Sequence, residues 1–139
     1  FIGMGTAPSG HYTTYQKNCD MNEILHISGY LALARKFSPL LATCENYRMH
    51  TRGKRGGDDT IQVATDIVLQ FFNGRTFAQW LNDRGMCATA SDKGDIIPYQ
   101  PFRELSFLKN KTGFSRGFYV PLTEKESVYE MMYWCRQNA

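Results

Sequence analysis

The sequence has few cysteines, few histidines and no long apolar segment, and each shortage excludes a class of protein. Its four cysteines, at positions 19, 44, 87 and 135, stand singly, and its three histidines are equally dispersed. Without a CxxC pair or a histidine cluster, the sequence predicts neither a zinc site nor a disulfide framework, so we expect free thiols in a reducing compartment. No stretch of about 18 apolar residues occurs, so no membrane-spanning helix is expected.

The composition is that of a folded domain. Hydrophobic residues make up 42% of the 139 residues and charged residues 21%, which is typical of a globular chain. The net charge of +3 permits a polyanionic partner without requiring one. The chain begins without methionine and without the basic and apolar segments of a signal peptide, so we expect an excerpt from a longer protein or a product of processing.

The most informative short stretch is Gly57-Asp58-Asp59, which separates the basic segment 52–55 from the strand-like segment 60–64. Adjacent carboxylates repel each other, but at a turn they can share divalent cations, and oxygen ligands suit Mg²⁺ or Mn²⁺. Gly57 permits the positive φ that such a turn often needs. The stretch therefore predicts a metal-bearing hairpin tip, although an exposed turn without a ligand is the commoner meaning of these residue types.

The basic segment supplies Arg52, Lys54 and Arg55. We expect these residues in the turn between a strand at 47–51 and the return strand at 60–64. A solvated loop is the usual outcome for such a run. Beside a metal site, the same charges can bind phosphates.

Apolar spacing predicts two further helices around this hairpin. A long helix is expected at roughly 12–36, where apolar residues recur with helical period. A second is expected at 76–84, with Gly85 as the residue that ends it. Residues 86–89 are a candidate strand.

The C-terminal third predicts a second hairpin and a last helix. Segments 107–109 and 117–120 are the expected strands, with Gly113 in the connection. Thr123 and Glu126 form a capping-box pattern, so we expect the last helix to begin there and to run to about residue 137.

Near the N-terminus, Ser9-Gly10 precedes Thr14 and Asn18. Thr14 and Asn18 are four residues apart and therefore share one face of the first helix. A hydroxyl and an amide beside a glycine-containing loop can bind a sugar hydroxyl. Ordinary capping at a helix start is the commoner role of these residue types.

Together these motifs resemble, in the same order, motifs B to E of the palm of viral RNA-dependent RNA polymerases of the picornavirus-like superfamily. The matching residues are Ser9, Gly10, Thr14 and Asn18, then Gly57, Asp58 and Asp59, then Lys93 in a loop, then Phe107, Leu108 and Lys109. The resemblance covers nearly the whole chain, and residues 119–134 resemble the start of the family's thumb.

The resemblance implies an α+β fold, a polymerase palm fragment. An antiparallel hairpin carries the Gly-Asp-Asp turn and packs against helices, and a second hairpin and a C-terminal thumb helix follow. By the same resemblance, residues 1–106 form a partial palm, residues 107–120 a primer-grip hairpin and residues 121–139 the start of the thumb.

The resemblance also implies an activity, RNA-directed RNA polymerisation by two-metal nucleotidyl transfer. Asp58 would coordinate catalytic Mg²⁺ (or Mn²⁺), and Asp59 would be a secondary metal ligand nearer the outer shell. Lys93 would protonate the leaving pyrophosphate as a general acid. The expected partners are an RNA template and primer, ribonucleoside triphosphates and the remainder of the polymerase, in the host cytoplasm within a membrane-associated replication complex.

Other implied roles concern the substrates. Ser9 and Gly10 would form a mobile loop near the incoming nucleotide, and Thr14 and Asn18 would recognise the ribose 2′-hydroxyl. Phe107, Leu108 and Lys109 would grip the primer end, and the basic residues Arg52, Lys54 and Arg55 would contact RNA.

The chain departs from the family pattern in three places. Gly56 stands where the family usually has an aromatic residue, Asn110 stands where it has arginine, and the strand before the turn is basic. The family's first palm carboxylate motif and its fingers residues do not occur in these 139 residues, so we expect the chain alone to be inactive. A reverse transcriptase palm and a non-catalytic RNA-binding remnant remain as alternatives.

Overall fold

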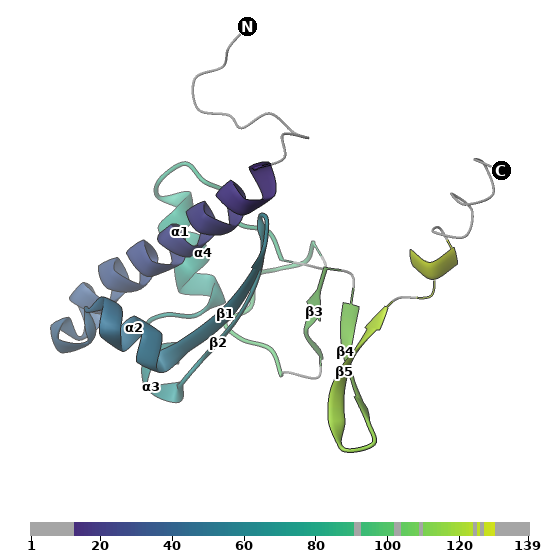
Figure 1. The fold of residues 1–139 in the computed structure, drawn as a ribbon. Helices are drawn as coiled ribbons and strands as arrows, with labels where there is room; N and C mark the ends of the chain where they lie inside the picture. Colours follow the sequence, from purple (N-terminus) through teal and green to yellow (C-terminus); the bar gives the residue numbers. More distant parts are fainter. Residues whose placement is uncertain are drawn as a thin grey trace, which may run out of the picture.

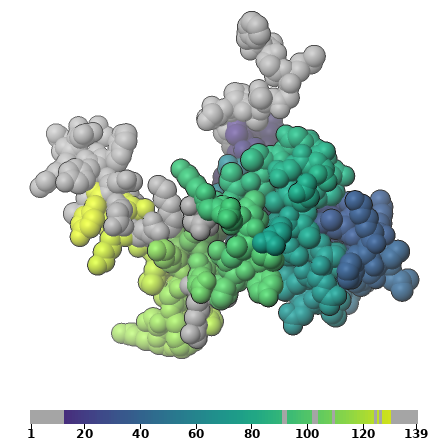
Figure 2. Space-filling model, turned by 180° about the vertical axis from the view of Figure 1, so that it is seen from behind, coloured from purple at the N-terminus to yellow at the C-terminus, as the bar shows by residue number. Residues whose placement is uncertain are grey.

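The computed structural model describes residues 13–90, 93–101, 104–108, 110–123, 125 and 127–129. The fold is α+β, as predicted, with helices beside two small antiparallel sheets. A two-stranded sheet, β1-β2, lies against the helices, and a three-stranded sheet, β3-β4-β5, follows further along the chain. The β4–β5 hairpin projects from the body of the molecule in opposite views (Figures 1 and 2).

The longest element is helix α1 (Thr14–Phe37), which confirms the helix predicted at roughly 12–36. It ends at Ser38, whose backbone is extended because Pro39 follows. A short 3₁₀ helix, η1 (Pro39–Leu41), then reverses the chain.

Helix α2 (Cys44–His50) replaces the strand predicted at 47–51, which was wrong except for Thr51. The Thr43 hydroxyl accepts a hydrogen bond from the Asn46 amide and caps the first turn. The helix also buries Tyr47 beside Tyr30, with ring centroids 5.3 Å apart. Capping and aromatic packing therefore outweigh the alternation on which the strand prediction rested.

Strands β1 (Thr51–Gly56) and β2 (Asp59–Ala64) pair antiparallel, from Thr51 opposite Ala64 to Gly56 opposite Asp59. The basic residues expected in a turn therefore lie within β1, and that prediction was wrong. Gly57 and Asp58 alone connect the strands, so pairing continues up to a two-residue loop. Of these two residues only Gly57 has a positive φ, of 71°, which is the pattern of a type II′ hairpin turn.

A short helix α3 (Asp66–Leu69) and helix α4 (Gly74–Asn82) follow the hairpin. The second helix confirms the prediction at 76–84, shifted by two residues because Asn73 forms a capping box with Thr76. Gly85 has a φ of 74°, as expected of a residue that ends a helix. Residues 86–89 form no strand, contrary to the prediction.

The core lies where α1, α2 and α3 meet. Its buried members are Tyr30, Ala34, Tyr47, Val68, Phe71 and Phe72. Helix α4 crosses α1 closely at Gly29, where an added Cβ would lie 2.6 Å from the Phe77 ring.

The second sheet has the order β3 (Ser106–Phe107), β4 (Asn110–Ser115), β5 (Phe118–Thr123). Gly113 therefore lies inside β4 rather than in the connection. The tight turn falls instead at Arg116 and Gly117, which both have positive φ.

The expected last helix lies mostly outside the described residues. Thr123 is the final residue of β5, and its hydroxyl donates to Asn110 Oδ1 at 2.8 Å. Residues 125 and 127–129 are helical. Glu126, the other half of the capping-box pattern, is not among the described residues.

Candidate functional site

The turn between β1 and β2 exposes two carboxylates on a buried backbone. Gly56 and Gly57 are buried, whereas Asp58 and Asp59 are exposed. Leu108 packs against Gly56, where an added Cβ would lie 2.8 Å from Leu108 Cδ2. The place where the family usually has an aromatic residue is therefore closely approached by a side chain from the β3–β4 connection.

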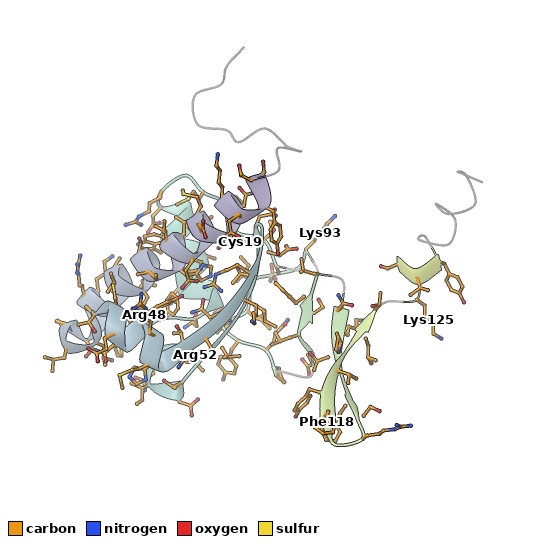
Figure 3. All side chains as sticks on the ribbon, in the orientation of Figure 1. Cys19, Arg48, Arg52, Lys93, Phe118 and Lys125 are labelled. Carbon is orange, nitrogen blue, oxygen red and sulfur yellow. The ribbon has the colours of Figure 1, made fainter. Side chains whose placement is uncertain are left out.

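Helix α1 holds the main chain of this turn through two side chains. The Gly57 amide donates to Cys19 Sγ at 3.2 Å. Asn22 Nδ2 donates to the carbonyl oxygens of Gly57, at 3.3 Å, and of Asp58, at 3.0 Å. Cys19 and Asn22 are three residues apart and share one face of the helix. Figure 3 shows Cys19 on α1 near the hairpin tip.

Arg55 forms a polar network on the helix-facing side of the hairpin. Its guanidinium lies 2.7 Å from Glu23 Oε2, and it donates to Tyr47 Oη at 3.1 Å and to Gln62 Oε1 at 3.2 Å. The Arg55 side chain is 7% exposed. The side chain predicted to contact RNA is therefore turned inward, where it links α1, α2 and both strands.

Arg52 and Lys54 are exposed. Because successive side chains of a strand point to opposite faces, Arg52 and Lys54 lie on the opposite sheet face from Arg55. They are paired in register with Val63 and Ile61. Arg52 also donates to the Thr51 and Arg48 carbonyl oxygens. Figure 3 shows Arg52, on β1, and Arg48, on α2, near the end of the hairpin that is away from its tip.

His26 lies on α1 one helical turn after Asn22 and is buried. Its ring centroid is 4.3 Å from that of Phe77, and Nδ1 lies 2.8 Å from the Asn22 carbonyl oxygen. Because that oxygen only accepts, Nδ1 carries the hydrogen. Burial, together with the positive charge of Arg55, lowers the pKa of His26 to about 4. The imidazole is therefore neutral near pH 7.

An open cleft of about 1110 Å³ runs from the turn along β2. Five of the predicted site residues line it: Asn18, Asp58, Asp59, Phe107 and Leu108. The structure therefore brings parts of motifs B, C and E onto one surface, although Asn18 and Leu108 are 90 residues apart in the sequence.

The remaining predicted residues are placed differently. Lys93 has a φ of 60° and is exposed. It is not part of the cleft lining, although Ala90 and Asp95, from the same segment, are. Figure 3 shows the Lys93 side chain directed outward. Thr14 is the first residue of α1.

Ser9, Gly10 and Lys109 lie outside the described residues. The structure therefore adds nothing to the roles that the resemblance implies for them.

Sequence reasoning missed the residues that hold the turn. Cys19, Asn22 and Glu23 contact the hairpin from one face of α1. Their spacing of three and four residues was a signal, because polar groups on the face that a helix buries need partners.

The described residues contain no group of three His, Cys, Asp or Glu side chains that could hold a metal ion. Asp58 and Asp59 are therefore an incomplete ligand set within this part of the chain. Among the same residues, no helix combines the length and the apolar character needed to cross a membrane.

The site is thus a pair of exposed carboxylates at a hairpin tip, held by a helix at the edge of an open cleft. The family model for viral RNA-dependent RNA polymerases matches residues 4–139, so the chain belongs to that family. The match confirms the resemblance that the motifs indicated.

Relatives support the picornavirus-like affiliation. The chain is 29% identical over 134 residues to the replicase polyprotein of Cricket paralysis virus, and 26% identical over 134 residues to that of Drosophila C virus. Each match covers 94% of this chain and 8% of the polyprotein. The genome polyprotein of Avian encephalomyelitis virus is 29% identical over 143 residues, covering 97% of this chain. The chain spans less than a tenth of the length of these relatives.

Proposed function

We propose that this chain is the palm segment and early thumb of a viral RNA-directed RNA polymerase. The whole enzyme adds ribonucleotides to an RNA primer on an RNA template. The observation that carries the proposal is the placement of Asp58 and Asp59 at a hairpin tip bordering the cleft that Asn18 and Leu108 also line. Membership of the polymerase family supports it.

The metal we propose is Mg²⁺ (or Mn²⁺), held by Asp58 and Asp59. The donor chemistry fits, because carboxylate oxygens suit these cations and neither histidine nor thiolate is needed. Further ligands come from the rest of the polymerase and from substrate phosphates. When bound, one such ion would activate the primer 3′-hydroxyl and both would stabilise the charge of phosphoryl transfer.

Each remaining residue takes the role that the resemblance to the polymerase family implies. Thr14 and Asn18 bind the ribose 2′-hydroxyl, with Ser9 and Gly10 in the loop beside the nucleotide. Lys93 gives its proton to the leaving pyrophosphate. Its exposed position leaves the Nζ accessible to a bound substrate.

RNA contacts complete the proposal. Phe107, Leu108 and Lys109 hold the primer end, and the exposed residues Arg52 and Lys54 contact RNA phosphates. Arg55 is assigned instead to holding the hairpin, because its side chain is buried and paired.

The domain limits and the location extend the same proposal. Residues 1–106 form the partial palm, residues 107–120 the primer-grip hairpin and residues 121–139 the start of the thumb. The full enzyme works in the host cytoplasm within a membrane-associated replication complex.

The test is a pair of aspartate substitutions in a full-length polymerase that carries this chain. We expect Asp58→Asn to lower nucleotide incorporation by about 100-fold or more, because it removes a charge that supports the transition state. Asp83→Asn, at an exposed aspartate after α4, should leave incorporation within about two-fold. RNA binding, measured by filter retention, should be unchanged in both.

Two other results would contradict parts of the proposal. Full incorporation by Asp58→Asn would remove this carboxylate from the mechanism. A folded full-length protein that binds RNA but incorporates nothing would favour the non-catalytic alternative. The 139-residue chain alone is expected to be inactive, because its carboxylate set is incomplete.

A further inference from the structure

We propose that Asn22 is a positioning residue for the Asp58 carboxylate, which it orients through the main chain of the turn. This inference rests on the function proposed above, because that function gives the Asp58 carboxylate a metal ion to bind. Asn22 is not one of the residues to which the family resemblance assigns a role.

The geometry of the amide carries the inference. Asn22 Nδ2 donates to the carbonyl oxygens of Gly57, at 3.3 Å, and of Asp58, at 3.0 Å. These two carbonyl groups belong to the peptide units on either side of the Asp58 Cα. Holding both units fixes the direction of the Cα–Cβ bond, and hence where the carboxylate is presented. Asp58 itself is exposed, so burial does not orient it.

Two other side chains of α1 hold the adjacent part of the hairpin. Cys19 Sγ accepts from the Gly57 amide, and the Glu23 carboxylate pairs with Arg55 two residues before Gly57. Asn22 in turn cannot easily shift along its helix, because its own carbonyl oxygen accepts from the buried His26. Three successive points along the hairpin are therefore attached to one rigid helix face.

The experiment uses the ¹⁵N-labelled 139-residue chain and a matched pair of variants. Asn22→Leu removes the amide that holds the turn. Asn46→Leu removes a comparable amide on α2, which donates to the Leu40 carbonyl oxygen of η1 at 3.1 Å. Three quantities are measured for each: the melting temperature, the ¹⁵N order parameters of Asp58 and Asp59, and the Mn²⁺ concentration that broadens their amide signals.

We expect Asn22→Leu to lower the order parameters of Asp58 and Asp59 and to weaken Mn²⁺ binding by about 5- to 10-fold, the effect of one or two lost hydrogen bonds. Asn46→Leu should lower the melting temperature without changing either quantity. If both variants lose stability alike and neither changes the turn or the Mn²⁺ affinity, Asn22 is only structural and the proposal fails.

Two other results of the experiment are possible, and each still tests the proposal. If the unsubstituted chain shows no Mn²⁺ broadening at Asp58, the metal site is not formed in this chain, and the order parameters alone decide the positioning role. If Asn22→Leu does not fold, Cys19→Val takes its place, with Cys19→Ser as the conservative control. The valine variant should speed hydrogen exchange at the Gly57 amide and the serine variant should not. Equal exchange in the two would show that the side chains of α1 do not fix the main chain of the turn, and the proposal would fail.

Discussion

Arg55 has a different role from the other basic residues before the acidic turn, because its side chain is buried and paired. Its guanidinium contacts three side chains, those of Glu23, Tyr47 and Gln62, and the Arg55 side chain is 7% exposed. Gly53 makes this possible, because an added Cβ there would collide with the guanidinium. A cation buried at this depth stabilises the fold only while its partners remain. Within one strand, therefore, a buried arginine holds the hairpin while Arg52 and Lys54 face solvent.

Removing the partner carboxylate tests this role. We expect Glu23→Gln to lower the free energy of unfolding by about 1–3 kcal/mol, because it leaves a desolvated guanidinium without a counter-charge. Urea denaturation at neutral pH measures the change. The double variant Glu23→Leu with Arg55→Met should recover most of the loss. A double variant no more stable than Glu23→Gln would mean that packing, rather than the charge, is responsible.

At the scale of whole elements, helices α1 and α4 pack closely because Gly29 has no side chain at their contact. Gly29 is buried on α1, and the Phe77 ring lies where a side chain would begin. Phe77 also stacks on Trp80, with centroids 5.9 Å apart, which limits its freedom to move away. Close packing of this kind leaves no room for an added methyl group.

We therefore expect Gly29→Ala to destabilise the protein by about 1–3 kcal/mol through overpacking. This loss is what remains after the helix propensity that alanine gains over glycine, about 1 kcal/mol, has been subtracted. Ser28→Ala, at the exposed neighbouring position, should be neutral or slightly stabilising. Thermal melting of the two variants distinguishes them, and equal melting temperatures would show that the helices separate without cost.

The elements that the sequence predicted correctly are those with local determinants. Helix α1 has a long apolar repeat and a proline at its end, and α4 has a capping residue and a terminal glycine. Helix α2 and strand β1 could not be predicted in the same way. Tyr47 is buried by Tyr30, which is 17 residues away (47 minus 30), and Arg55 is paired with Glu23 in another element. These tertiary contacts outweigh local propensity.

For the molecule as a whole, His26 links stability to pH. The unfolded chain takes up a proton near the ordinary pKa of 6.5, whereas the folded protein does so only near 4. The unfolded state therefore binds more protons between these values, and stability falls as pH falls through this window. We expect a loss on the order of 3 kcal/mol from pH 6.5 to pH 4 due to this group.

Urea unfolding at several pH values, compared with His26→Gln, isolates this contribution. The variant should show a shallower decline between pH 6.5 and pH 4, and the two proteins should have parallel curves above pH 7. Identical slopes throughout would show that carboxylates alone account for the acid sensitivity.

The candidate site shows the same division between local and tertiary information. The acidic turn, Asn18 and the residues Phe107 and Leu108 were predicted from motifs, and they do line one cleft. The contacts of Cys19 and Asn22 with that turn join residues 38 and 36 positions apart. No local sequence pattern predicts these contacts, because they depend on how the hairpin packs against the helix.

The attachment of the hairpin to α1 also leads us to expect a particular order of folding events. The helix and the hairpin turn are each built from near neighbours in the sequence, but the Glu23–Arg55 pair requires the closure of a long loop. It should therefore form after the transition state, once the two elements have docked. Breaking it then speeds unfolding and leaves the refolding rate nearly unchanged. A residue that secures the turn in the native protein thus governs how long the protein stays folded, and not how fast it folds.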